Sequence, residues 1–285
     1  MPLLAPPPEA RFWGSGPAQG ARCCLFGAPL DLTGSGRLGT GQAPPAVRRA
    51  SHNIESYSPR LDADLFDAGL ADLGDLALAG LPMEAALAEI ERQTAAVLER
   101  TIPVVVGGEH TIALAVGRAV KQRYLDAVII SLDAHLDLAD ELEGRKVAHG
   151  TWACRLGEEL GGFGDFIMLG MRSGTRDEWQ RSKGCLWQSP DVVLPDELRA
   201  RIVDRPIHLS VDIDVLDPSA APGTGTPEPP GISSAELFRF LYSLEGLNVV
   251  ALDVNEILPE VDPAGITIIT GAKLIREATI LLSRP

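Results

Sequence analysis

Acidic and imidazole side chains follow two strongly apolar segments of this chain, 127–132 and 206–211, at every second residue. Alternate side chains of an extended chain point to the same side, so each group can converge on one point just beyond its strand. Ionisable groups buried there without partners would each cost several kcal/mol, and a cation among them removes that cost. The pattern therefore predicts a metal site. Its residues are Asp133, His135 and Asp137 in the first segment and Asp212 and Asp214 in the second.

A third apolar segment, 102–106, leads to a further imidazole at His110. The whole set has four carboxylates and two imidazoles, which is more than one ion needs, and it predicts a two-metal site. Oxygen and imidazole ligands without a thiolate favour Mn²⁺-like ions over tetrahedral zinc. Two such ions, about 3.5–4 Å apart, can share a water molecule and lower its pKa. We therefore expect two Mn²⁺ ions in each subunit.

Strand-like and helix-like segments alternate along the chain, which predicts an α/β fold with parallel strands and helices on both faces. In such sheets ligands collect beyond the carboxyl ends of the strands, where the candidate ligands lie. The predicted strands are 22–27, 64–69, 102–106, 127–132, 166–169, 207–211 and 249–254. The main predicted helices are 43–51, 82–100, 111–124, 151–160, 176–183, 192–201, 234–244 and 269–282.

Composition excludes some partners of the 285-residue chain. Its formal net charge of −14 argues against a nucleic-acid partner, which would require a basic face. No apolar run reaches membrane-spanning length, and the N-terminus lacks the pattern of a signal peptide. Four cysteines without a regular spacing are typical of free thiols in the cytoplasm. Residues 1–20, rich in Pro and Gly, are expected to form an irregular arm before a single domain over 21–285.

Further candidate groups follow or adjoin the same strands. His149 lies in the loop after the first ligand segment, where an imidazole suits proton transfer near neutral pH. Glu256 follows the predicted strand 249–254 and could face a cationic group. His208 lies inside a strand, and we expect it to be a hydrogen-bonded core histidine. Four aspartates, two divalent ions and one hydroxide sum to −1 before Glu256 is counted, which favours a delocalised cation as the substrate.

The six candidate ligands and His149 lie within four of five motifs that resemble, in order and spacing, the signatures of the ureohydrolases. This family includes arginase, agmatinase and guanidinobutyrase, and the resemblance is closest to agmatinase. It extends from about residue 22 to 282 and implies a three-layer α/β/α fold with a mostly parallel sheet of about eight strands. The motifs lie at 107–111, 133–137, 149–150, 210–218 and 223–231.

The resemblance also implies a role for each site residue. His110 and Asp137 would bind one Mn²⁺, His135 and Asp214 the other, and Asp133 and Asp212 would bridge the two. Glu256 would hold the guanidinium of the substrate, Asp137 would pass a proton to the leaving amine, and His149 would ferry protons to and from solvent. The products would be urea and an amine. Family members of this kind are expected to be homotrimers or homohexamers.

The choice of guanidino substrate depends on the loop 138–148. It holds three acids, Asp140, Glu141 and Glu143, which suit the distal ammonium of agmatine better than a carboxylate. The segment 170–178 also resembles agmatinase, and Glu178 within it is a candidate substrate-binding residue, with Arg172 as a structural support. We therefore expect agmatine or a close analogue to be cleaved to urea and an amine, which is putrescine in the case of agmatine.

Three alternatives remain at this point. A guanidino-acid hydrolase, similar to guanidinobutyrase or arginase, would use Arg145 or Lys146 to bind a substrate carboxylate. A deacetylase of the same fold would normally keep a single zinc, and the pair of His110 and Asp137 argues against it. The third alternative is a metal-binding scaffold without catalytic activity, in which His149 and Glu256 would have no role in urea production.

Overall fold

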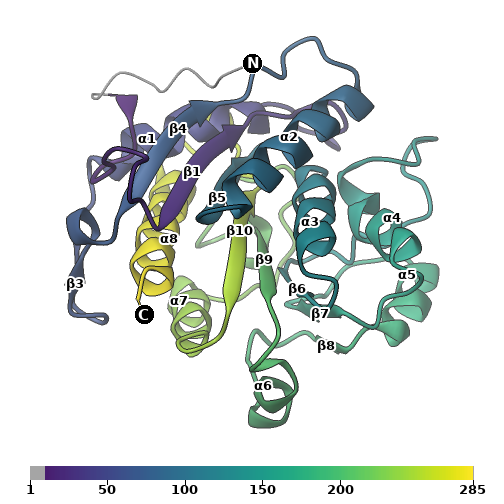
Figure 1. Ribbon diagram of the computed structural model, residues 1–285. Coiled ribbons are helices and arrows are strands. Elements are labelled where there is room, and N and C mark those ends of the chain that lie inside the picture. The colour runs from purple at the N-terminus through teal and green to yellow at the C-terminus, as the bar shows by residue number, and fades with distance from the viewer. Residues whose placement is uncertain (1–9, 285) are drawn as a thin grey trace.

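The computed structural model describes residues 10–284 of the chain. A central sheet of eight strands lies between two layers of helices (Figure 1). Every paired strand of this sheet is parallel to its neighbour. The predicted α/β/α fold with about eight strands is therefore confirmed. Among the described residues no helix is both long and apolar enough to cross a membrane.

The strands follow the order β4-β1-β5-β10-β9-β6-β7-β8 across the sheet. β5 and β6 are consecutive strands in the sequence, but β10 and β9, which come later in the chain, lie between them in the sheet. The strand order therefore changes direction at the centre of the sheet. Ligand sites of open α/β sheets occur at such switch points. The strands are β1 Cys23–Ala28, β4 Leu70–Asp75, β5 Ile102–Gly107, β6 Val128–Leu132, β7 Phe166–Leu169, β8 Trp187–Ser189, β9 Ile207–Asp212 and β10 Val249–Asn255.

Each face of the sheet buries its own apolar cluster. Helices α1, α6, α7 and α8 contribute buried residues to the cluster on one face, and α2, α3 and α4 to the cluster on the other. Helix boundaries follow local signals: two prolines occupy the first turn of α1, and capping boxes begin α5 and α7. The helices are α1 Ala43–Ser51, α2 Met83–Leu98, α3 Ile112–Arg123, α4 Trp152–Glu159, α5 Arg176–Arg181, α6 Asp196–Ile202, α7 Ser234–Ser243 and α8 Ile266–Leu282.

Register places the ends of four neighbouring strands at one level. Val254 of β10 is paired with Val106 of β5 on one side and with Val211 of β9 on the other, and Val211 is paired with Leu132 of β6. The residues that follow these positions therefore emerge together at the carboxyl edge of the sheet. Side chains far apart in sequence meet there because their strands are adjacent.

Two sequence predictions of secondary structure are wrong. The segment 64–69 is not the edge strand: the Asp64 side chain accepts a hydrogen bond from Phe66 N and caps a short 3-10 helix, and Gly69 then turns the chain with a φ of 72°. The edge strand β4 begins only at Leu70. The predicted helix over 192–201 begins instead at Asp196, after Pro195 in extended conformation, and the three-residue strand β8 before it was not predicted.

The described part of the N-terminal arm, residues 10–20, packs on the edge of the sheet; residues 1–9 lie outside the described range. Phe12 is buried, and Trp13 contacts the rings of His52 and Phe66. The backbone N–H of Phe12 donates to Asp72 Oδ2 at 2.8 Å. Asp72 is itself buried and forms an ion pair with Arg48 of α1, so one carboxylate ties the arm and a helix to β4.

Replacing Asp72 with alanine should lower the free energy of unfolding by about 3 kcal/mol, the low end of the range for a broken buried ion pair. The loss stays at the low end because Arg48 retains the partly exposed Asp75 as a partner. Urea denaturation of Asp72→Ala and wild type measures the difference. As a control, Glu89→Ala removes an exposed pair with Arg92 on α2 and should cost less than about 1 kcal/mol. Equal losses in both variants would contradict this assignment.

Candidate active site

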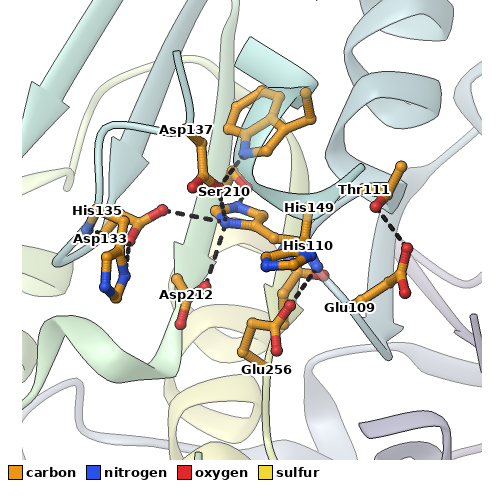
Figure 2. Close-up of polar contacts among 12 residues, drawn as sticks. Glu109, His110, Thr111, Asp133, His135, Asp137, His149, Ser210, Asp212 and Glu256 are labelled. Atoms are coloured by element: carbon orange, nitrogen blue, oxygen red, sulfur yellow. Dashed lines mark hydrogen bonds and ion pairs between the residues drawn. The ribbon is translucent and has the colours of Figure 1, made fainter. Parts of the chain in front are cut away.

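His110 lies at the centre of a cluster of carboxylates at the carboxyl edge of the sheet. Its Nδ1 lies 3.1 Å from Asp133 Oδ2, 3.1 Å from Asp137 Oδ2 and 3.2 Å from Asp212 Oδ2. All four residues are buried, and Figure 2 shows the three carboxylates around the imidazole. His110, Asp133 and Asp212 have ligand atoms within 4.8 Å of one another and could hold a metal ion.

A second group of possible ligands adjoins the first. His135 Nδ1 lies 2.9 Å from Asp214 Oδ2 and 3.7 Å from Asp133 Oδ1. Asp133, His135 and Asp214 also have ligand atoms within 4.8 Å of one another. Asp133 belongs to both groups and offers a different oxygen to each. The structure thus gathers all six predicted ligand side chains in two adjoining groups that share one carboxylate.

The clusters hold more negative charge than their surroundings balance. Burial opposes the protonation of His110, but the three neighbouring carboxylates outweigh it and raise the imidazole pKa well above its ordinary value. Burial likewise opposes protonation of His135, and Asp133 and Asp214 raise its pKa to about 12. Burial and the charges of Asp214 and Asp133 raise the pKa of Asp212 well above its usual range. Protons are therefore bound strongly where cations could bind instead.

Two neighbouring buried atoms, one of them on the carboxylate that both clusters share, indicate whether a cation fits this site. His110 Nδ1 and Asp133 Oδ2 are 3.1 Å apart, yet neither has a hydrogen bond of acceptable geometry with any atom of residues 10–284. Buried polar atoms normally have hydrogen-bond partners, and atoms that lack them are often ligands of an ion. Oxygen and imidazole donors around such atoms suit a divalent cation of the manganese type. The residues present therefore fit the metals that the sequence predicts.

The turn that carries Asp137 is held from both sides. Asp137 has a left-handed φ of 51°, which is uncommon for a residue other than glycine and costs conformational energy. Trp152 Nε1 at the start of α4 donates to Asp137 Oδ2 at 2.9 Å. The next residue, Leu138, donates its N–H to Glu178 Oε1 at 3.2 Å. These contacts compensate the unusual backbone and aim Asp137 at the cluster.

Glu178, predicted as a substrate-binding residue, has both carboxylate oxygens engaged by the protein. Oε1 accepts from Leu138, and Oε2 accepts from the N–H and hydroxyl of Thr175, both at 2.8 Å. The second pair forms the capping box at the start of α5. Glu178 lines the cavity described below, but its contacts hold the loop of Asp137, and its role in substrate binding stays a prediction.

Glu256 follows β10 and also has a left-handed backbone, with a φ of 62°. Its N–H donates to Gly108 O at 2.9 Å, and its Oε1 accepts from His110 N at 2.7 Å. Burial raises the pKa of the Glu256 carboxyl to about 8, and the charges of Glu109 and Asp214 act in the same direction. A cation beside this group would favour its ionised form. The loops after β5 and β10 thus fix the carboxylate between them.

A buried hydrogen-bond chain supports His110 from behind. His110 Nε2 lies 3.0 Å from Ser210 Oγ, and Ser210 donates to Asp253 Oδ1 at 2.5 Å. Asp253 also accepts from Asn255 Nδ2 at 2.5 Å and from His208 Nε2. The prediction that His208 is a hydrogen-bonded core histidine is confirmed. Since Ser210 gives its only proton to Asp253, it accepts from His110 Nε2, which leaves Nδ1 available to a cation among the carboxylates.

Arg172 supports the segment that carries Asp214, as its position in the sequence predicts. Its guanidinium donates to Asp214 O at 2.8 Å, Val215 O at 3.2 Å and Glu228 O at 2.8 Å. These acceptors are main-chain carbonyls, so the Asp214 carboxylate remains free to face His135. Arg172 thereby connects β7 to the loops after β9 without neutralising a ligand.

A cavity of about 420 Å³ opens over the clusters, within the size range of small-molecule sites. It brings together residues from the loops after β1, β6 and β7 and from the carboxyl ends of β9 and β10 and the loops that follow them, and His149 lies on its wall. His149 N donates to Thr33 Oγ1 at 3.1 Å, and His149 Nδ1 lies 3.2 Å from the same oxygen. The principal lining residues are His135, Asp137, Glu141, His149, Glu178, Asp212, Thr226 and Glu256.

Comparison with known proteins agrees with this geometry. The family model described as "Arginase family" matches residues 21–281. The agmatinase of Bacillus subtilis (strain 168) is 36% identical over 263 residues, which cover 90% of each chain. The guanidinobutyrase of Pseudomonas aeruginosa is 34% identical over 272 residues, covering 90% of this chain and 85% of the relative. The crystal structure of a putative agmatinase from Clostridium difficile superposes with a TM-score of 0.87 at 31% identity, covering 94% and 99% of the two chains.

The chain therefore belongs to the arginase family. It is a ureohydrolase that acts on guanidino compounds, as the sequence motifs predict. The relatives named above differ in the substrates that their names state, so family membership alone leaves the particular guanidine open.

Several residues that shape the site have no assigned role in the sequence interpretation. They act on the predicted residues rather than on the cavity itself. Most come from positions distant in sequence from their partners, which a motif cannot reveal. Glu109 and Ser210 lie within motifs and could have been found as polar residues at buried strand ends. The set comprises Thr33, Glu109, Trp152, Ser210 and Asp253.

Proposed function

We propose that this protein is a Mn²⁺-dependent hydrolase that cleaves agmatine, or a close dicationic analogue, to urea and an amine, which is putrescine in the case of agmatine. One observation carries the proposal: five carboxylate residues line the cavity, and none of its lining residues within 10–284 is a lysine or arginine. Such a lining favours a substrate with a cation at each end. The similarity to an agmatinase supports the same choice.

We assign the two metal positions to the two adjoining clusters. His110 and Asp137 would belong to one position and His135 and Asp214 to the other, with Asp133 and Asp212 shared. The unpartnered buried atoms and the strongly shifted pKa values support this assignment. Two bound divalent ions supply a water of lowered pKa and stabilise negative charge that develops during hydrolysis.

Glu256 would bind the guanidinium of the substrate. One of its oxygens accepts from His110 N, which leaves the other for the N–H groups of the substrate. A guanidinium keeps its charge at any ordinary pH and pairs well with a carboxylate. The pairing would ionise Glu256 and hold the guanidinium carbon beside the ligand carboxylates Asp137 and Asp212, which line the same cavity.

Two residues would move protons during the reaction. Hydrolysis of a guanidinium consumes one water and gives neutral urea and a protonated amine, so both protons of the water must reach the leaving nitrogen, which goes from N–H to NH₃⁺. Asp137 lines the cavity and would pass the first of them, the proton of the attacking hydroxide, to that nitrogen. His149, on the same wall, would exchange protons between the cavity and solvent.

Glu141 is the acid that we assign to the distal ammonium of the substrate. Of the three acids predicted for this role, Asp140 already pairs with Lys146 at 2.5 Å and with Arg155 at 3.0 Å. Glu141 lines the cavity, whereas Glu143 does not. The same contacts weaken the case for a guanidino acid, because Lys146 is paired with Asp140 and Arg145 donates to Leu32 O at 3.3 Å.

The proposal also covers the cellular compartment, the oligomeric state and the binding partner of the enzyme. Its four cysteines are all free, which suits the reducing cytoplasm. We propose a homotrimer or homohexamer by analogy with the family. The partner of the site is a small cationic guanidino compound rather than a nucleic acid, in keeping with the net charge of −14.

Urea release from a panel of guanidines tests the substrate. The Mn²⁺-loaded enzyme should have its highest kcat/KM with agmatine, and a far lower value with arginine and 4-guanidinobutyrate, whose carboxylates would enter an acidic cavity. Glu256→Gln should lower kcat/KM by on the order of 10²–10³-fold, as when one partner of a buried charge pair is removed. Preference for the carboxylate-bearing substrates would reject the proposal in favour of a guanidino-acid hydrolase.

Glu141→Gln should raise KM for agmatine roughly 2- to 5-fold with little change in kcat, because an exposed charge pair contributes modestly to binding. The matched control is Glu143→Gln, which removes the same charge from the same loop outside the cavity. Steady-state kinetics at low ionic strength, where exposed charges are least screened, measures both variants. Equal effects of the two substitutions would show that Glu141 makes no specific contact.

Removing the metals should abolish urea release, and adding Mn²⁺ should restore it. Elemental analysis of active protein should find two ions per chain, the number needed for a shared water. Asp133→Asn should lower this number, because Asp133 contributes to both clusters. Asp204→Asn, at an exposed position outside the cavity, should leave it unchanged. Full activity with one ion or none per chain would overturn the two-metal assignment.

A further inference from the structure

We propose that Thr33 and Glu109 are positioning residues that fix the orientation and tautomer of His149, so that its Nε2 is the nitrogen available for proton exchange. The role in proton exchange rests on the function proposed above, whereas the tautomer does not. The inference concerns three loops, those after β1, after β5 and before α4, which meet at a single hydroxyl group. Neither Thr33 nor Glu109 belongs to the predicted set of ligands and catalytic groups.

Glu109 is fully buried and accepts four hydrogen bonds. Its Oε2 accepts from the backbone N–H groups of Leu32 at 2.6 Å and Thr33 at 2.5 Å. Its Oε1 accepts from the hydroxyls of Thr33 at 2.8 Å and Thr111 at 2.6 Å. Backbone N–H groups can only donate, and an ionised carboxylate can only accept. Both hydroxyls donate to Glu109. The Thr111 hydroxyl also lies 3.4 Å from that of Thr33, but Glu109 is the nearer acceptor and carries the charge, so the proton of Thr33 points to Glu109.

The two acceptor sites of the Thr33 hydroxyl then determine which ring nitrogen of His149 carries the hydrogen. A hydroxyl has one proton and two acceptor sites. The proton goes to Glu109, and one acceptor site takes the His149 N–H at 3.1 Å. The second acceptor site faces His149 Nδ1 at 3.2 Å. Two lone pairs would repel each other there, so Nδ1 carries a hydrogen.

A neutral imidazole has only one N–H. With that hydrogen on Nδ1, the Nε2 of His149 has a free lone pair. Because Nδ1 is occupied by Thr33, Nε2 is the ring nitrogen that can take a proton from a group in the cavity and return it. Histidine in water favours the opposite tautomer, with the hydrogen on Nε2, so the protein has to impose this arrangement.

The surrounding loops are packed tightly enough to impose the Nδ1–H tautomer on His149. Glu109 N donates to Leu30 O at 2.8 Å, and Gly108 N donates to Ala28 O at 3.0 Å. A Cβ at Gly108 would lie 1.9 Å from Leu30 O, so the two loops approach as closely as backbone allows. Thr33 is 5% exposed. The hydroxyl consequently has little freedom to turn away from either partner.

Ring ¹⁵N NMR of histidine-labelled protein tests the tautomer directly and without any assay of activity. The resonances of His149 are assigned from the spectrum of His149→Asn, and spectra are recorded above the pH at which the ring loses its charge. The expected result is the Nδ1–H form in wild type. A dominant Nε2–H form in wild type would overturn the inference, whether or not the enzyme hydrolyses a guanidine.

Two substitutions should then shift the tautomer in different ways. Thr33→Val removes the acceptor and should move the ratio toward Nε2–H roughly 2- to 10-fold, the range that one neutral hydrogen bond supplies. Thr33→Ser should keep the wild-type ratio. Glu109→Gln should go further and make the Nε2–H tautomer of His149 the preferred one. The amide of the new glutamine would donate to the Thr33 hydroxyl. The proton of Thr33 would then point to His149 Nδ1. A simple loss of packing would produce no inversion.

Kinetics provides the second readout. Thr33→Val should lower kcat and change the pH profile of kcat with little change in KM, and Thr33→Ser should restore both. Thr40→Val is the matched control, since Thr40 is also buried but its hydroxyl has no hydrogen-bond partner among residues 10–284. An unchanged tautomer and pH profile in Thr33→Val would reject the inference. Absence of urea release by wild type would instead reject the proposed function.

Discussion

Repulsion among buried carboxylates is the constraint on which the rest of this structure depends. Asp133, Asp137 and Asp212 all face one imidazole nitrogen from within about hydrogen-bond distance. Like charges so close in a poorly solvated site disfavour one another strongly, and positive charge placed among them relieves that repulsion. The protein supplies it weakly, through protons on His110 and His135. Bound divalent cations would supply it fully, which would link the stability of the site to its chemistry.

The supporting contacts avoid competing for that charge. Arg172 donates its guanidinium to backbone carbonyls, including that of Asp214, and leaves the Asp214 carboxylate for the cluster. Asp137 is held by an indole N–H and Asp212 by the backbone N–H of Asp214, which are both neutral donors. A lysine or arginine in these places would pair with the carboxylates and reduce the need for metal. Because these donors are neutral, the carboxylates stay anionic and can bind a cation.

The sequence was sufficient to predict the layers and to bring the candidate ligands together at one edge of the sheet, because both follow from local patterns. Alternation beyond an apolar strand locates Asp133 and Asp212, and parallel strands bring their ends to one edge. The sequence was insufficient where partners are remote: Thr33 and Glu109 are 76 residues apart, and Ser210 and Asp253 are 43 apart. The wrong edge strand over 64–69 has a local cause instead, since Asp64 caps a short 3-10 helix and Gly69 turns the chain, and pairing with β1 begins only at Leu70.

In the function proposed above, substrate choice depends on a weaker kind of interaction than metal binding does. The candidate ligands come from strand ends that the whole core fixes, whereas Glu141 belongs to an exposed loop. Loops of this kind vary readily within a family, which fits the different substrates that the relatives' names state. An exposed carboxylate alone distinguishes substrates only a few-fold. Stronger discrimination has to come from the cost of placing a substrate carboxylate in a cavity that already holds Glu256, Asp137 and Asp212, and that cost grows as the cavity excludes water.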